Sequence, residues 1–384
     1  MEPITTTAAL EALCARLAGA PFLAFDTEFM RETTYWPKLC LVQVASPDEA
    51  AIIDPLAEGL DLEPLLALMR DESLIKVCHA GRQDVEIFNN LGVIPRPMFD
   101  SQIAAMAAGF GEQVAYDALV RQILRVELDK SSRFTDWSRR PLSSAQLSYA
   151  LADVVHLAEL YPTLRDRLDA KGRLAWVAED MAALADPAAY NLDPENAWRR
   201  LKPRKFSARY LSVFQAVAAW RERTAQARDQ VRSRILKDEA IDEIAAQVPT
   251  DAAAFDRLRS VPKGFGNGKF GAELASVIQA AVQGADTRAP LIERPPAAPQ
   301  APGAVVELLK VLLKARAEEA NVAPKLIATV PDLERLAATE KEEGPLLQGW
   351  RREVFGEDAL RLKRGELALV LEGSRVRVRE VPPK

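Results

Sequence analysis

The chain has 384 residues, of which 48% are hydrophobic and 27% are charged. This length is more than one hydrophobic core usually supports, so we expect two or three domains. No run approaches the roughly 20 apolar residues of a membrane helix, and the first residues lack the basic and apolar regions of a signal peptide. The cysteines Cys14, Cys40 and Cys78 form no CxxC pair, which predicts reduced thiols in a cytoplasmic protein.

The formal net charge of −5 is unevenly distributed. Residues 1–170 carry 15 basic and 25 acidic side chains, residues 171–300 carry 20 and 16, and residues 301–384 carry 15 and 14. Six basic residues and no acid lie between Arg199 and Arg209. Such a cluster faces either phosphates or solvent, and composition alone does not choose between these. The acidic total therefore does not exclude nucleic acid as a partner.

The first 170 residues alternate strand-like and helical runs. Strands are predicted over 22–29, 40–45, 51–54 and 74–78, and helices over 62–70, 84–91, 102–108, 117–124 and 143–168. The first three strands are so close in sequence that only hairpins can join them. This order predicts an α/β domain with a mixed sheet.

From about residue 171 onward the strand pattern disappears and two helical sets follow. Helices are predicted over 206–226, 238–246, 252–258 and 271–282, and again over 304–319, 331–338 and 344–355. The similar order suggests a diverged duplication, although the second set lacks the glycine-rich KGFGNG run of the first. The tail 375–380 alternates Arg with Val, and whether it forms a strand stays open. The predicted domain boundaries are 1–170, a connecting segment 171–205, 206–286, a Pro/Ala-rich linker 287–303, 304–373 and a tail 374–384.

Two carboxylates stand out in the first predicted strand. Asp26 and Glu28 are two residues apart, so they project from the same face of a strand that is otherwise apolar. Like charges held side by side are unfavourable unless a cation or hydrogen bonds compensate them. A strand end with solvated carboxylates is the alternative.

Two further acids follow in the same region. Asp84 comes just after the strand 74–78, where α/β sheets place ligand groups, although Asp is also a common helix cap. Tyr149 and Asp153 are four residues apart on a helix and therefore share a face. Taken alone, a half-buried Tyr beside a solvated Asp explains that pair. Asp100 is predicted to cap the helix that follows it.

Together the runs FDTEF, HAGRQD and YALAD resemble the three motifs of the DEDD superfamily of 3′→5′ exonucleases. The Tyr-x-x-x-Asp spacing matches its tyrosine-containing subgroup, and neither His79 nor His156 stands where the histidine-containing subgroup needs one. The flanking runs TYWPKLCLVQVA, FDSQIAA and TDWSRRPLSSAQLSYALADV are typical of the ribonuclease D family. The helical sets resemble two HRDC (helicase-and-RNase-D C-terminal) domains, the second more weakly.

This resemblance implies a ribonuclease H-like α/β exonuclease domain followed by two all-α domains. It also implies a two-metal mechanism with Mg²⁺ or Mn²⁺, ions that prefer carboxylate oxygens to His or Cys. The residues that match the metal-binding acids are Asp26, Glu28, Asp84 and Asp153, with Asp26 bridging both ions. Tyr149 matches the catalytic tyrosine. Because a phenol is a poor base at neutral pH, we expect it to orient the attacking water.

The implied substrate is RNA, above all tRNA precursors, shortened from the 3′ end to nucleoside 5′-monophosphates by a monomer. The residues expected to hold RNA are His79, Arg82, Gln83, Lys130, Arg133, Arg139, Arg140, Arg204 and Lys205. His79 has an equally plausible packing role. No nucleotide cofactor is expected, because no phosphate-binding loop is present. The alternatives are a 3′→5′ exonuclease of single-stranded DNA and an inactive nucleic-acid-binding protein.

Overall fold

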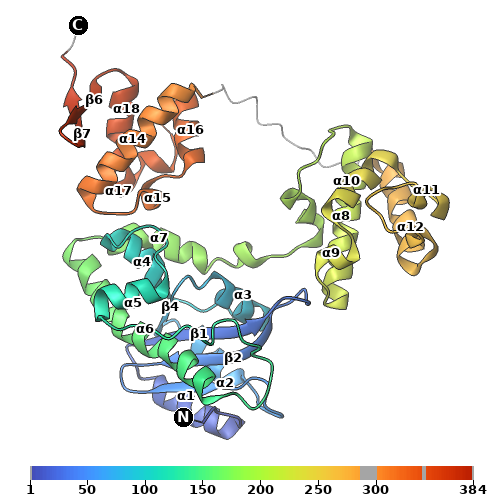
Figure 1. Cartoon of the computed structure of the whole chain (residues 1–384), viewed down its shortest axis with the longest axis horizontal. Helices are drawn as coiled ribbons and strands as arrows, with labels where there is room; N and C mark the ends of the chain where they lie inside the picture. The colour runs from blue at the N-terminus through green and yellow to red at the C-terminus, as the bar shows by residue number, and fades with distance from the viewer. Residues whose placement is uncertain (1, 286–300, 340–342, 383–384) are drawn as a thin grey trace. The chain divides into compact units, whose positions relative to one another are not determined.

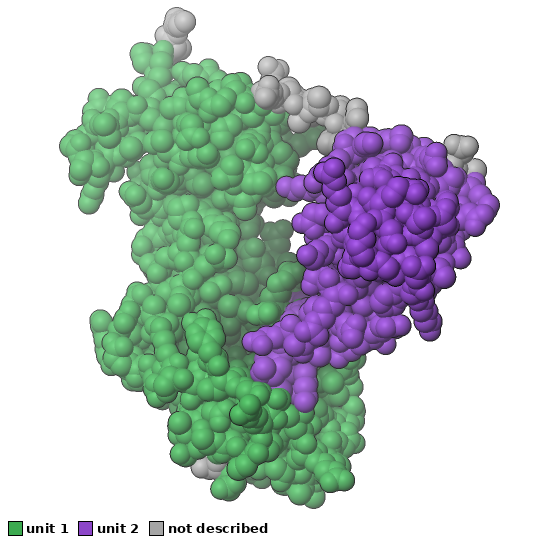
Figure 2. Space-filling view, turned by 45° about the vertical axis from the view of Figure 1, so that its right-hand side comes forward, with its two compact units in different colours: residues 1–28, 41–189, 295–384 green, residues 29–40, 190–294 purple. Residues whose placement is uncertain are grey.

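A computed structural model of the chain describes residues 2–285, 301–339 and 343–382 (Figure 1). The chain divides into two compact units, which Figure 2 shows in different colours. Unit 1 contains residues 1–28, 41–189 and 295–384, and unit 2 contains residues 29–40 and 190–294. The predicted linker 287–303 lies outside the described residues from 287 to 300. No helix in the described ranges has the length and apolarity needed to cross a membrane.

The N-terminal part of unit 1 is built on a five-stranded sheet in the order β3-β2-β1-β4-β5. Strand β2 pairs antiparallel with β3, whereas β4 pairs parallel with both β1 and β5. The mixed sheet predicted from the sequence is therefore confirmed. The strands are β1 (Phe22–Met30), β2 (Lys38–Ala45), β3 (Ala50–Ile53), β4 (Ile75–Cys78) and β5 (Met98–Asp100). Strand β5 has only three residues, and the sequence pattern did not predict it.

Helices lie on both faces of this sheet. In β1, Phe22 and Ala24 pack with helices α4 to α7, while Phe25 turns to the other face and contacts Phe88 of α3. This alternation follows the two-residue period of a strand. The helices of this part are α1 (Thr7–Leu17), α2 (Glu63–Arg70), α3 (Arg82–Asn90), α4 (Ser101–Ala108), α5 (Tyr116–Leu124), α6 (Ser144–Ala170) and α7 (Leu174–Leu184). The sequence pattern missed α1 and α7.

The C-terminal part of unit 1 is a helical domain that ends in a β-hairpin. Strand β6 (Leu367–Glu372) pairs antiparallel with β7 (Arg375–Glu380), and Gly373 in the turn has φ of +63°. The tail 375–380, which the sequence left open, is therefore a strand, and its partner 367–372 was not predicted. The helices are α14 (Gly303–Ala320), α15 (Pro324–Ile327), α16 (Val330–Ala338), α17 (Gly349–Arg351), a π-helical turn (Arg352–Gly356) and α18 (Glu357–Lys363).

This helical domain is docked on the exonuclease-like part of the same unit. The rings of Trp176 and Trp350 stack with centroids 4.4 Å apart and planes 3° apart. Arg351 forms ion pairs with Glu179 and Asp180 at 2.9 and 3.2 Å. The domain is therefore held by both an aromatic and an ionic contact.

Gly109 lets the two parts of unit 1 approach closely. It ends α4 with φ of +91°, and a Cβ built on it would lie 2.7 Å from the backbone oxygen of Asn321. Only glycine accommodates both the left-handed backbone and this approach. Nearby, the Ala323 amide donates a hydrogen bond to the Met106 carbonyl at 2.9 Å.

Unit 2 is a helical domain that also contains the segment between β1 and β2. Tyr35, from that segment, is 4% exposed within the core formed with α8, α10 and α12. The helices are η2 (Pro194–Arg200), α8 (Ala208–Arg228), α9 (Arg232–Ile235), α10 (Asp238–Gln247), α11 (Ala252–Asp256) and α12 (Lys269–Gln283). They match the four helices predicted for 206–282, with α9 and η2 added.

A buried carboxylate joins the segment 29–40 to these helices. Glu222 of α8 is fully buried and accepts hydrogen bonds from the Tyr35 hydroxyl, from Arg200 at 2.7 Å and from Arg232 at 2.6 Å. Asp229 accepts from the backbone amides of Tyr35 and Trp36 at 3.0 and 2.9 Å. The chain leaving Glu28 thus enters unit 2 directly.

Candidate active site

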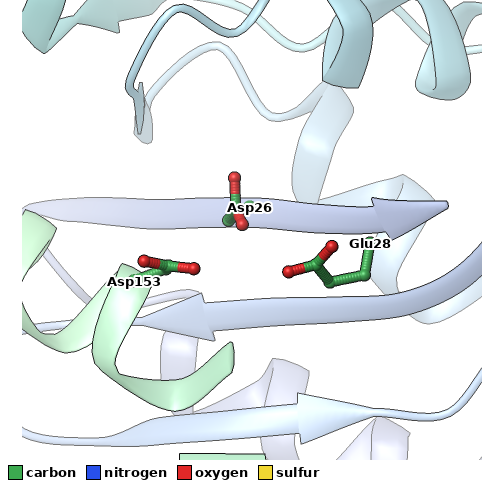
Figure 3. A group of neighbouring side chains, drawn as sticks. All are labelled: Asp26, Glu28 and Asp153. Atoms are coloured by element: carbon green, nitrogen blue, oxygen red, sulfur yellow. The ribbon is translucent and has the colours of Figure 1, made fainter. Parts of the chain in front are cut away.

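Three carboxylates converge on one face of the sheet. Asp26 and Glu28 project from β1 on the face where Phe22 and Ala24 pack against α6, and Asp153 projects toward them from α6 (Figure 3). One oxygen from each of the three lies within 4.8 Å of the others, and all three side chains are half-buried. The two-residue period of the strand places Asp26 and Glu28 on the same face, and the packing of α6 brings Asp153 to them.

The mutual repulsion of these acids appears in their protonation. Burial, followed by the charges of Asp153 and Asp84, raises the pKa of Glu28 to about 8. Burial raises the pKa of Asp153 to about 7 against the opposing effects of Tyr149 and Arg133. Burial, together with the charges of the other three acids, raises the pKa of Asp26 well above its ordinary value. Burial is therefore the main cause of all three shifts, and repulsion between the acids adds to it at Asp26 and Glu28.

Asp84 lies beside this group but is held differently. It is 7% exposed and accepts a hydrogen bond from the hydroxyl of Thr27, the residue between Asp26 and Glu28. Burial raises its pKa to about 6, against the lowering effect of the Thr27 bond. Sequence reasoning missed Thr27. The only available signal was a polar side chain on the otherwise apolar opposite face of β1.

Asp100 organises the turn that leads to Asp84. Its carboxylate caps α4 by accepting from the amides of Gln102 and Ile103, so the predicted helix cap is confirmed. It also accepts from the amides of Ala80 and Gly81, at 3.1 and 3.0 Å. One carboxylate thus ties the turn after β4 to the start of α4.

Tyr149 lies one helical turn before Asp153, and its hydroxyl lowers the pKa of that carboxyl. Burial and the charges of Asp153, Glu28 and Asp26 raise the pKa of the Tyr149 hydroxyl above its ordinary value. The phenol therefore stays protonated at neutral pH and donates a hydrogen bond rather than accepting a proton. Its ring centroid lies 6.1 Å from that of the buried Trp137.

The donor set fits a hard divalent cation. Carboxylate oxygens are the ligands that Mg²⁺ and Mn²⁺ prefer, and no Cys or His belongs to the converging group. A cation there would also offset the repulsion that raises the pKa values of the acids. Asp26, Glu28 and Asp153 would hold it directly, and Asp84 adjoins the same site.

The residues expected to hold RNA near the site fall into two groups. Arg82, Gln83, Lys130, Arg133 and Arg139 are exposed. Lys130 pairs with Asp117 at 2.6 Å, and Arg139 pairs with Asp136 at 3.1 Å. The charge of Arg133 lowers the pKa values of both Asp153 and Tyr149, so Arg133 lies near the acid cluster.

Two of the expected residues make ionic or hydrogen-bond contacts with other side chains of the same domain. Arg140 makes a two-pronged ion pair with Asp54, with both N···O distances at 2.6 Å. His79 places Nδ1 2.9 Å from the Ser101 hydroxyl, and its ring packs on Tyr116. Their contacts support the loop before α6 and the end of β4, respectively.

In unit 2 the basic run is partly neutralised. Arg200 pairs with Glu222, and Arg204 lies 3.6 Å from Asp242. Lys202, Lys205 and Arg209 are exposed and form no ion pair within the described ranges. This surface therefore keeps fewer uncompensated charges than the sequence count suggests.

Comparisons with known proteins identify the families to which this chain is similar. The 3′→5′ exonuclease family model matches residues 1–169, and the HRDC model matches residues 211–278. Ribonuclease D of Granulibacter bethesdensis is 51% identical over 98% of this chain and 95% of its own length. Ribonuclease D of Acidiphilium cryptum is 51% identical over 99% of this chain and 97% of its own.

The structural comparison agrees. The crystal structure of Escherichia coli RNase D, described as an exoribonuclease involved in structured RNA processing, superposes with a TM-score of 0.79 at 29% identity. The match covers 95% of this chain and 98% of the other. The chain therefore belongs to the ribonuclease D family of 3′→5′ exonucleases, hydrolases of phosphodiester bonds.

Proposed function

We propose that this enzyme removes extra nucleotides from the 3′ ends of structured RNAs, above all tRNA precursors, and releases nucleoside 5′-monophosphates. The observation that carries the proposal is the convergence of Asp26, Glu28 and Asp153, with Tyr149 one helical turn before Asp153. The full-length likeness to ribonuclease D supports RNA as the substrate. The cation-rich surface of unit 2 would add sequence-independent affinity for phosphates.

The acids are proposed to hold two divalent cations, Mg²⁺ or Mn²⁺. Asp26 would contribute to both sites, because the charges of Asp84, Asp153 and Glu28 all act on its carboxyl. When bound, such ions activate the attacking water and stabilise the charge on the leaving oxygen. The chain's own contribution is to fix these oxygens before substrate arrives.

Tyr149 is proposed to orient the attacking water. Its raised pKa keeps the hydroxyl protonated, and its place one turn before Asp153 puts it beside the acid cluster. It therefore positions the nucleophile and does not remove its proton. Arg133, exposed and near the acids, is the best placed of the expected cations to contact the RNA backbone.

The remaining RNA contacts are proposed at the exposed residues Arg82, Gln83, Lys130, Arg139 and Lys205, with His79, Arg140 and Arg204 supporting the surface that carries them. The second helical domain, which the HRDC model does not cover, is proposed as a diverged HRDC domain. We further propose that the enzyme acts as a monomer in the cytoplasm, where its three buried cysteine thiols stay reduced.

The test compares RNA and DNA directly. Purified enzyme with Mg²⁺ is incubated with a 5′-labelled tRNA carrying a 3′ extension and with single-stranded DNA of the same sequence, beside Asp26→Asn. We expect stepwise shortening of the RNA, 5′-monophosphate products and no activity in the variant. Shortening of DNA alone, or equal activity in Asp26→Asn, contradicts the proposal.

A further inference from the structure

Phe134 is the most exposed large hydrophobic side chain in the described ranges. Its side chain is 90% exposed, in the loop between α5 and α6 that leads to the catalytic helix. Single apolar side chains are common on protein surfaces, so exposure alone assigns no role. Its surroundings make Phe134 unusual.

The turn that carries Phe134 is anchored on both sides. The Thr135 amide and hydroxyl both donate to the Ser132 carbonyl, at 3.3 and 2.9 Å, and Ser132 is 4% exposed. Gln146 of α6 donates to the Thr135 hydroxyl at 3.1 Å. Trp137, three residues after Phe134, is buried. The backbone of this turn is therefore fixed by hydrogen bonds and by the buried Ser132 and Trp137, and it holds the Phe134 ring outward.

The same turn borders the acid cluster. Trp137 packs near Tyr149, and the charge of Arg133 acts on both Tyr149 and Asp153. The Arg133 guanidinium carbon lies 5.2 Å from the centroid of the Phe134 ring, a cation–π distance. An exposed aromatic ring and a cation thus lie side by side at the edge of the catalytic site.

This pairing suits a flexible strand of nucleic acid. Proteins that hold single strands combine cations for the phosphates with aromatic rings on which bases stack, because every base has a stacking face. A 3′→5′ exonuclease must hold an unpaired end while each nucleotide leaves. Two partners in one turn can engage one base and its phosphate together.

We propose that Phe134 is a stacking platform for an unpaired base of the RNA strand and that Arg133 contacts a phosphate of the same strand. The inference rests on the proposed action on RNA and names a residue that holds that substrate. The stacking is independent of base identity, so it serves substrates of any sequence. Stems, whose bases are already stacked, would gain nothing from this ring.

Equilibrium binding tests the platform apart from cleavage. In chains inactivated by Asp26→Asn, Phe134→Ala is expected to weaken binding of an unpaired RNA oligonucleotide about 5- to 150-fold, the range for one stacked base. Phe134→Trp should preserve or improve binding. Leu371→Ala, at another strongly exposed apolar residue, is the matched control and should change nothing.

A series of oligonucleotides with one abasic nucleotide, moved stepwise from the 3′ end, identifies the stacked base. At one position the difference between Phe134 and Phe134→Ala should disappear, because the base that stacks is missing. Equal binding by Phe134→Ala on intact RNA overturns the inference. A loss that persists at every abasic position also overturns it, since the ring would then only support the turn. Failure of the active enzyme to shorten RNA refutes the proposed function instead.

Discussion

At the scale of single residues, the acids of the cluster make the stability of the metal-free protein depend on pH. The pKa values of Asp84, Asp153 and Glu28 rise to about 6, 7 and 8 in the folded chain, above their ordinary values near 4. The unfolded chain therefore loses these protons first as pH rises. Metal-free protein should lose stability between about pH 4 and pH 8, because the folded state holds the protons more tightly.

Divalent metal should reverse this loss. We expect Mg²⁺ to raise the thermal midpoint more at about pH 8 than at about pH 5.5, because its ligands must be deprotonated to bind. Thermal melts at both pH values with and without Mg²⁺ measure the effect. Glu28→Gln should reduce both the loss with pH and the gain with metal. An equal Mg²⁺ effect at the two pH values would mean that the cluster does not bind the ion.

Tyr149 should separate catalysis from metal binding. Tyr149→Phe removes the hydroxyl near Asp153 and keeps the ring beside Trp137. We expect the rate of RNA shortening to fall about 100-fold or more, because the attacking water loses the group that orients it, with the Mg²⁺ shift in thermal midpoint retained. Tyr161→Phe, on the buried face of α6, is the matched control. Loss of the Mg²⁺ shift in Tyr149→Phe would refute the role of water positioning.

At the scale of elements, Glu222 joins the segment between β1 and β2 to the helices of unit 2. Burial by itself raises its pKa, but the bonds from Arg232, Tyr35 and Arg200 lower it to about 2. A depressed carboxylate pKa stabilises the fold above the unfolded value near 4, and this contribution disappears as pH falls toward 2. The segment that continues from β1 thus depends on one buried anion.

Replacing that anion should destabilise unit 2. We expect Glu222→Gln to lower the free energy of unfolding by about 2–3 kcal/mol at neutral pH, because two guanidinium groups lose their partner but can still reach water. The difference from the parent chain should shrink as pH falls through about 4 toward 2. Urea titrations at several pH values measure it, with the exposed Glu273→Gln as control. A pH-independent difference would show that the lost charge is not the cause.

Local patterns predicted the elements that have a clear period and missed those that depend on distant partners. The alternation in β1 predicted that Asp26 and Glu28 share a face, and the structure confirms it. No local pattern reveals that α6 packs so that Asp153 meets them. Strand β5 is too short for a period, and β6 was missed, although Gly373 between the apolar run 367–371 and the alternating run 375–380 was a usable signal for a hairpin. The burial of Tyr35 in unit 2 depends on partners more than 180 residues away.

At the scale of the whole molecule, the sequence predicted domains as consecutive segments. The compact units of the structure instead combine stretches that are distant in the sequence. The C-terminal helical domain belongs to unit 1 with the exonuclease-like part, and unit 2 takes its residues from two stretches of chain. The stacked pair Trp176 and Trp350 and the ion pairs of Arg351 hold the C-terminal domain in place. Each of these docking contacts can therefore be removed by a single substitution.

A double-mutant cycle measures this docking. Trp176→Ala and Trp350→Ala should each lower the free energy of unfolding, and the double variant should lose about 0.5–1.5 kcal/mol less than their sum, because the stack is lost only once. Urea titrations of the four chains give this coupling energy. Trp176→Ala combined with Leu371→Ala, whose side chain is 75% exposed, should be additive. Additivity of the two tryptophan changes would mean that the C-terminal domain is not docked through this stack in solution, and its position would then depend on Arg351 and the contacts around Gly109.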